Sequence, residues 1–134
     1  MSRSTATRQR PLSPHLSIYR PTITMTMSIV HRITGGALYF GTLLVAWWLI
    51  AAASSERQFE IANAVFGSWF GRIILFGYTW TLFHHMMGGI RHLIWDTGAG
   101  LEKETASKIA WATLVCSIVL TVLVWIAGYA ARGF

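Results

Sequence analysis

Three long apolar stretches, separated by short polar segments, dominate the pattern of this chain. They cover residues 33–55, 73–90 and 109–131, and none of them contains Asp, Glu, Lys or Arg. Their lengths of 23, 18 and 23 residues reach or approach the roughly 20 residues that a helix needs to cross a bilayer. The pattern predicts an all-α integral membrane protein with three transmembrane helices, at about 22–53, 68–97 and 105–129.

The segments outside these stretches predict the rest of a single membrane-anchor domain that covers residues 1–134. Three prolines within the first 21 residues favour an extended tail, because proline fixes φ and removes a hydrogen-bond donor. In the first loop, Phe59, Ala62 and Phe66 recur at helical spacing and predict a short amphipathic helix on the outer membrane interface. Gly98 is expected to end the second membrane helix.

Composition and charge support the membrane class and suggest an orientation. Hydrophobic residues make up 54% of the chain and charged residues only 12%, about half the usual share in soluble proteins. With the N-terminus inside, eight Lys and Arg residues fall on the inner side and three on the outer side. The positive-inside rule therefore predicts that residues 1–21 form a cytoplasmic tail. The formal charge of +6 does not indicate nucleic-acid binding, because the basic residues sit at helix ends.

The candidate chemistry of the second membrane helix rests on its histidines. Ionisable groups in a membrane helix are costly, so His84, His85 and His92 are functional candidates as haem ligands or proton carriers. At 100° per residue, His85, His92 and Asp96 share one face, and the glycines at 88–89 lie between the histidines. Glycine there leaves room for a flat group such as a porphyrin, or equally for another helix.

A second polar cluster lies at the start of the first membrane helix. Ser28 and Arg32 are four residues apart on one face, and His31 is one turn from Ser28. These side chains could bind the carbonyl of a quinone, and Arg32 with His31 could neutralise haem propionates. The alternative is that Arg32 is only an interfacial anchor whose charge reaches the membrane surface.

The number of available ligands constrains any haem site. A low-spin b-type haem takes two axial ligands. His31 is expected nearer the surface than His85, and no other deep histidine faces His85 from a second helix. The second ligand is therefore expected from a companion subunit, so that this chain forms half of a helical bundle.

Three segments closely resemble the cytochrome b membrane-anchor subunit of succinate dehydrogenase, respiratory complex II. They cover residues 10–19, then 28–35 with the pattern S-x-x-H-R-x-x-G, then 85–96 with the pattern G-I-R-H. They occur in the order and spacing of that family, and the three-helix plan extends the resemblance over nearly the whole chain. It implies a subunit that anchors a flavoprotein and an iron–sulfur subunit to the membrane, where electrons from succinate reach ubiquinone at the inner face.

The resemblance also implies roles for single residues. The family's haem-iron ligand corresponds to His85, and the other ligand of the haem b comes from the companion anchor subunit. The family's quinone-binding serine and arginine correspond to Ser28 and Arg32, and His31 with Arg32 would lie near the haem propionates. Asp96 matches an acidic residue that could help proton delivery. No catalytic residue and no dicarboxylate active site is expected on this chain, and His84 is expected to make a packing or polar contact instead.

Two other classes of function compete with this interpretation. The chain could be a haem-free structural anchor of a respiratory complex, with histidines that only join helices. It could also belong to a proton-conducting or transport assembly, although the spans carry no second acidic relay. The absence of a convincing transit peptide favours a bacterial inner membrane over the mitochondrial inner membrane.

Overall fold

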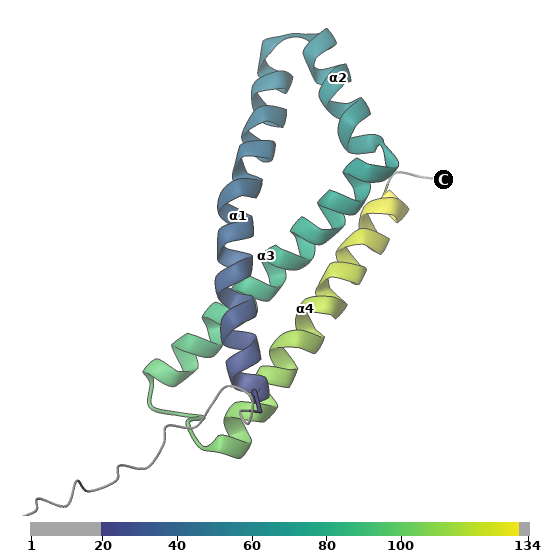
Figure 1. The fold of residues 1–134 in the computed structure, drawn as a ribbon. Helices are drawn as coiled ribbons and strands as arrows, with labels where there is room; N and C mark the ends of the chain where they lie inside the picture. Colours follow the sequence, from purple (N-terminus) through teal and green to yellow (C-terminus); the bar gives the residue numbers. More distant parts are fainter. Residues whose placement is uncertain (1–19, 132–134) are drawn as a thin grey trace, which may run out of the picture.

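The computed structural model describes residues 20–131, and within them it contains only helices (Figure 1). The four helices are α1 (Ile23–Ser54), α2 (Glu56–Gly67), α3 (Trp69–Asp96) and α4 (Lys103–Ala131). α1, α3 and α4 correspond to the three predicted membrane helices, and α2 is the amphipathic helix predicted in the first loop. The proline-rich tail and the motif at 10–19 lie outside the described residues, apart from residues 20–21 of the tail.

The three long helices have lengths suited to a bilayer. They contain 32, 28 and 29 residues, so each is about 42 Å long or more, against about 30 Å of hydrocarbon. Among the described residues, α1 and α4 are each apolar enough to span a membrane, whereas α3 qualifies only together with α2. α2 is bent by 77° from α3, so it does not simply continue that span. The three-span arrangement with the N-terminus inside stays a prediction.

Serine side chains cap the first turns of α2 and α3, at the two points where the helical chain is interrupted. The hydroxyl of Ser55 accepts a hydrogen bond from the backbone N–H of Gln58 at 3.3 Å, and Ser68 accepts from Gly71 at 3.1 Å. Such N-cap bonds satisfy backbone donors that the first turn of a helix leaves unpaired. Near the same end of α1, Trp48 donates through its indole N–H to the Asn63 side-chain oxygen at 3.0 Å. α2 therefore folds back against α1 before α3 begins.

α3 ends at a turn that requires glycine. Gly98 has a φ of +80°, and its N–H bonds to the carbonyl of Trp95 at 2.9 Å, which is a left-handed helix ending as predicted. Gly100 also has a positive φ of +71° and accepts a hydrogen bond from the Trp95 indole at 3.1 Å. This short turn places α4 antiparallel to α3, and the two helices run side by side (Figure 1).

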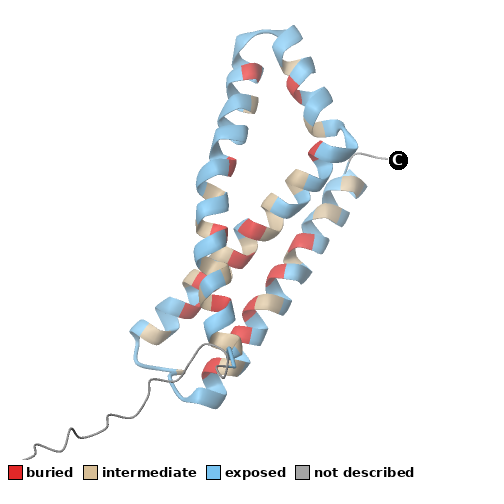
Figure 2. Cartoon of the chain, viewed as in Figure 1, coloured by how far each residue is buried: buried red, intermediate tan, exposed pale blue. Residues whose placement is uncertain are grey.

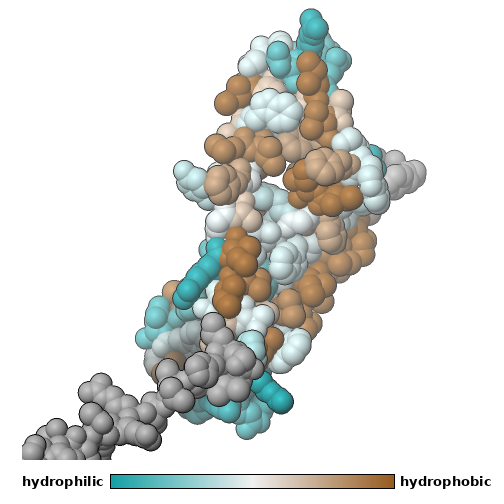
Figure 3. All heavy atoms as spheres, in the orientation of Figure 1, coloured by the Kyte–Doolittle hydropathy of each residue, from teal (hydrophilic) through white to brown (hydrophobic). Residues whose placement is uncertain are grey.

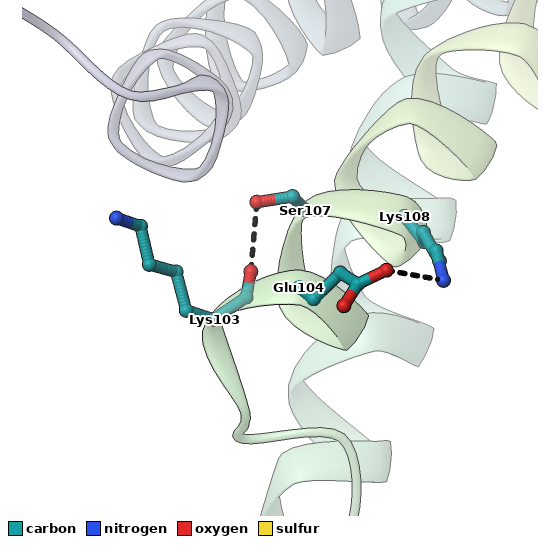
Figure 4. Close-up of polar contacts among 4 residues, drawn as sticks. All are labelled: Lys103, Glu104, Ser107 and Lys108. Carbon is teal, nitrogen blue, oxygen red and sulfur yellow. Dashed lines mark hydrogen bonds and ion pairs between the residues drawn. The ribbon is translucent and has the colours of Figure 1, made fainter.

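The first turn of α4 carries the ion pair that the structure records within the described residues (Figure 4). Lys108 and Glu104 lie 2.9 Å apart at positions i and i+4, and both side chains are largely exposed. Ser107 donates to the carbonyl of Lys103 at 2.8 Å. An exposed pair of this kind contributes little, about 0.3–0.5 kcal/mol. Its glutamate also suits the positive end of the helix dipole.

The distribution of side chains is that of a membrane protein. The buried positions hold mainly small or hydroxyl-bearing residues (Figure 2), and on α4 these are Ala106, Ala110, Thr113, Ser117 and Thr121. Large apolar residues instead point outward on α1, α3 and α4, as the brown surface in Figure 3 shows. Small residues let helices approach closely, and an apolar exterior suits lipid or another apolar subunit. α4 thus packs against the other helices through this small-residue face.

Candidate functional site

Three histidines from α1 and α3 come together in one group, which we call the histidine cluster (His31, His85 and His92). The rings of His31 and His85 stack with their centroids 4.0 Å apart and their planes within 7°. The ring of His92 lies 5.3 Å from that of His31 at a tilt of 59°. The two polar clusters predicted on separate helices therefore form a single site where α1 crosses α3.

The side chain of His85 is held in a defined orientation. Its Nδ1 lies 3.1 Å from the backbone carbonyl of His31 and 3.4 Å from the hydroxyl of Thr34. A carbonyl can only accept a hydrogen bond, so the neutral ring carries its proton on Nδ1. Nε2 then keeps its lone pair, which is the arrangement of a metal-ligating histidine whose other nitrogen donates to a backbone carbonyl.

Glycines make room for both stacked rings. A Cβ at Gly35 would lie 3.0 Å from Cε1 of His85, and a Cβ at Gly88 would overlap the His31 ring. The room at Gly88, which the sequence assigned to a porphyrin or another helix, is thus filled by a single side chain of α1. Gly36 and Gly89 have nothing within 4 Å of an added Cβ. These two glycines leave an open surface beside the cluster.

Gly88 has no room for a side chain, whereas its neighbour Gly89 has, so alanine should have different effects at the two positions. Gly88→Ala should destabilise the complex by about 1–3 kcal/mol, because the new methyl group displaces the His31 ring from its stack. Gly89→Ala, the matched control, should be neutral or slightly stabilising, since alanine favours the helix and meets no atom. Thermal unfolding of the purified complexes measures both. Equal stabilities for the two variants would contradict the contact between His31 and Gly88.

One expectation about His31 was wrong. It was not expected to face His85, yet the two rings are in contact. Eight residues, or about 12 Å of helix, separate His31 from the start of α1, and eleven residues, or about 16 Å, separate His85 from the end of α3. The two residues thus lie at comparable distances from these helix ends, and the crossing of the two helices brings the side chains together.

The stacked rings nevertheless are not a pair of axial ligands. Two histidines that ligate one haem iron each point a ring nitrogen at the metal from opposite sides, so they face each other end-on and cannot be stacked face to face. The observed 4.0 Å leaves no room between them. Nor does His92 oppose His85, because it follows on the same helix, about 10 Å further along the axis. Among the described residues, His85 has no partner for trans ligation of one iron.

The predicted quinone-site residues lie next to the cluster. Ser28 is half-buried and Arg32 is exposed, and both lie within one turn of His31 on α1. Neither side chain has a hydrogen-bond partner within the described residues. Asp96 ends α3 and is exposed, with no ion-pair partner in the described part of the chain. Ser28 and Arg32 are thus free to bind a polar ligand, whereas Asp96 is separated from His85 by eleven residues of helix.

His84 makes the polar contact that its helical angle predicted. It is 1% exposed, and its Nδ1 lies 3.3 Å from the hydroxyl of Ser117 on α4. Trp80 packs beside it with a ring-centroid distance of 5.1 Å. His84 therefore joins α3 to α4 and takes no part in the histidine cluster.

Arg91 was expected among the ionisable groups of the inner half of this helix and was counted with the inner charges, but no role was assigned to it. It is 1% exposed. Its Nε and Nη1 atoms have no hydrogen-bond partner, and its guanidinium lies 5.1 Å from the ring centroid of Trp95. The spacing contained the signal: His84, Gly88 and Arg91 follow each other at four and three residues on one helix face. Nε2 of His31 is likewise buried and unpartnered.

The described residues contain no group of three or more His, Cys, Asp or Glu side chains that could hold a bare metal ion. The histidine cluster offers instead a single oriented nitrogen, as a haem iron requires. A cavity of about 830 Å³ lies elsewhere, among α2, the first half of α3 and the C-terminal parts of α1 and α4. Its walls include Trp48, Arg72, Tyr78 and Trp125, and none of the predicted site residues. The chemistry of the histidine cluster, not the size of this cavity, identifies the candidate site.

Comparison with known proteins decides the family. The sequence matches the model of the succinate dehydrogenase/fumarate reductase transmembrane subunit over residues 6–124. The chain belongs to this family. The succinate dehydrogenase cytochrome b556 subunit of Paracoccus denitrificans is 49% identical over 114 residues, which are 85% of this chain and 88% of the relative. That of Rickettsia felis is 42% identical over 118 residues, 88% of this chain and 92% of the relative.

The family also includes mitochondrial members. The mitochondrial succinate dehydrogenase cytochrome b560 subunit of Sus scrofa is 36% identical over 115 residues, 84% of this chain and 68% of the relative. The resemblance inferred from the three motifs is therefore confirmed. The relatives are subunits of an enzyme complex, and the bacterial relatives together with the apolar helices indicate a bacterial membrane protein.

Proposed function

We propose that this chain is the membrane anchor of a succinate–quinone oxidoreductase, that it holds haem b jointly with a companion anchor subunit, and that it contributes to the ubiquinone-reduction site. The observation that carries the proposal is the orientation of His85, whose Nδ1 is engaged by the His31 carbonyl while Nε2 stays available. The names of the relatives, which are cytochrome b subunits of succinate dehydrogenase, support it.

The residues of the cluster fit a haem. His85 would ligate the iron through Nε2, and the open backbone at Gly36 and Gly89 would let a flat ring or a companion helix approach. A bound haem b supplies reversible one-electron chemistry within the membrane. His31 and Arg32 would face its propionates. Because no histidine of the described residues can oppose His85, we expect the second axial ligand from the companion subunit.

The quinone site would use the exposed part of the same region. The Ser28 hydroxyl and the Arg32 guanidinium can donate hydrogen bonds to a quinone carbonyl oxygen, which becomes more negative as electrons arrive. Reduction of a quinone takes two electrons and two protons, so a site open to water suits it. Asp96, exposed at the end of α3, would help to deliver protons from the inner surface.

The chain would contribute no dicarboxylate active site. Oxidation of succinate would take place on a flavoprotein subunit, and an iron–sulfur subunit would carry the electrons to the membrane. In agreement with the charge asymmetry, the N-terminus, the start of α1 and the end of α3 would lie on the cytoplasmic side of a bacterial inner membrane. Ser28 and Arg32 then lie on the side where the hydrophilic subunits dock.

Isolation of the complex through this chain tests the assignment. A tag after Phe134 should bring down, in mild detergent, a flavoprotein and an iron–sulfur protein that together oxidise succinate with a soluble dye. It should also bring down a second small membrane subunit. Recovery of transport or proton-conducting proteins without succinate oxidation would contradict the proposal.

A further inference from the structure

Thr34 on α1 is a buried hydroxyl that lies against the candidate iron ligand on α3. It is 2% exposed, and its hydroxyl donates a hydrogen bond to the backbone carbonyl of His31 at 3.0 Å. The oxygen of this hydroxyl also lies 3.4 Å from Nδ1 of His85, and the His31 carbonyl lies 3.1 Å from the same nitrogen. One turn of α1 therefore presents two oxygens, a carbonyl and a hydroxyl, to a single ring nitrogen of α3.

The positions of the protons in this triangle follow from the donors available. A hydroxyl has one proton, and the Thr34 proton is engaged by the His31 carbonyl. The hydroxyl oxygen can then only accept from His85, as the carbonyl does. Two acceptors at Nδ1 favour the tautomer that carries its proton there and leaves the lone pair on Nε2.

The same contacts select one of two orientations of the His85 ring. The stack on His31, with the planes within 7°, fixes the plane of the ring but is equally compatible with a 180° flip about the Cβ–Cγ bond. The flip would replace Nδ1 by a carbon and would exchange Nε2 with Cε1. Cε1 lies 3.0 Å from the Cβ position of Gly35 and Nε2 lies 3.9 Å from it, so the flip would turn Nε2 toward α1. The hydrogen bonds at Nδ1 therefore decide where the lone pair of Nε2 points.

We propose that Thr34 is a positioning residue for the haem ligand, whose hydroxyl holds the His85 ring in its ligating orientation and adjusts the electron density at Nε2. The inference rests on the proposed haem binding. A histidine that donates more strongly from its other nitrogen is a more basic ligand, and a more basic ligand favours oxidised iron. Thr34 occupies part of the acceptor capacity of the His31 carbonyl and so weakens the hydrogen bond from His85. Loss of this hydroxyl should therefore lower the midpoint potential of the haem.

The test compares Thr34→Val with wild type in the complete purified complex, by redox titration of the haem absorption band. Valine keeps the shape of the side chain and removes the hydroxyl. We expect about a threefold shift of the haem equilibrium toward the oxidised form, which for a one-electron couple is about 30 mV. The electron paramagnetic resonance spectrum of the oxidised haem should change as well, because it depends on the orientation of the axial rings. An unchanged spectrum together with an unchanged or higher potential overturns the inference.

Two further variants separate this role from a general effect of the substitution. Thr42→Val is the matched control, because Thr42 also lies on α1 and donates to the carbonyl three residues before it, that of Tyr39, but is exposed. It should keep the wild-type potential and spectrum. Thr34→Ser retains the hydroxyl and should restore both properties. A serine variant that behaves like Thr34→Val overturns the inference, and so does an equal shift in Thr42→Val.

A smaller side chain covers the case in which the valine variant does not assemble. Thr34→Ala removes the same hydroxyl without adding a methyl group where the helices cross, and it should lower the potential in the same direction. A haem with the wild-type potential in this variant overturns the role of Thr34 and leaves the proposed haem binding intact. A wild-type complex without haem overturns the proposed function itself, before any variant is made.

Discussion

His85→Ala should abolish the haem b absorption band of the isolated complex. The substitution removes the nitrogen that would bind the iron, and no other histidine of the described residues can replace it. His84 is turned to Ser117, and His31 is stacked on the missing ring. Reduced-minus-oxidised difference spectra of the purified complex, normalised to flavin, measure the change.

The adjacent histidine provides the control for this variant. His84→Asn should lose the contact between α3 and α4 and lower the thermal stability of the complex by about 1–3 kcal/mol, because it disturbs a buried hydrogen bond. Its haem band should stay at the wild-type position. A normal band in His85→Ala, or a lost band in His84→Asn with an intact complex, would reverse the assignment of the two histidines.

Arg32→Ala should separate the two activities of the complex. Ubiquinone reduction should fall on the order of 10- to 100-fold, the equivalent of losing a hydrogen bond to a charged group worth about 1.5–3 kcal/mol. Oxidation of succinate by a soluble dye should keep its wild-type rate, because the dye takes its electrons before they reach the membrane site. Steady-state rates with the two acceptors measure the difference.

Removal of an arginine elsewhere on the chain controls for the loss of charge. Arg57→Ala removes an exposed arginine from α2, away from the histidine cluster, and should leave both rates unchanged. Unchanged ubiquinone turnover in Arg32→Ala would show that Arg32 does not bind the quinone and serves only as an anchor at the membrane interface. A parallel loss of dye and quinone activity would indicate failed assembly instead.

Much of the fold could be predicted because the bilayer imposes strong local rules. The uncharged stretches located the three long helices, and the spacing of Phe59, Ala62 and Phe66 located α2. The angle of 100° per residue separated His84 from His85, and Gly98 marked the end of α3. Each of these features depends on one helix or one turn, so the sequence contains the information directly.

The contacts between helices were harder to predict. The stack of His31 on His85 depends on where α1 crosses α3, and helical periodicity does not give that crossing. Arg91 was counted among the inner charges, and its burial was not predicted. Its burial follows from the rotation of α3, which turns the face with His84 and Gly88 toward the other helices and leaves His92 exposed.

We infer that this chain supplies an oriented haem ligand within a succinate dehydrogenase complex. The decisive measurement is a reduced-minus-oxidised spectrum of the wild-type complex, isolated in mild detergent through this chain. We predict a low-spin b-type haem in amounts stoichiometric with the flavin. A complex that oxidises succinate but contains no haem would contradict the claim and leave the chain as a structural anchor.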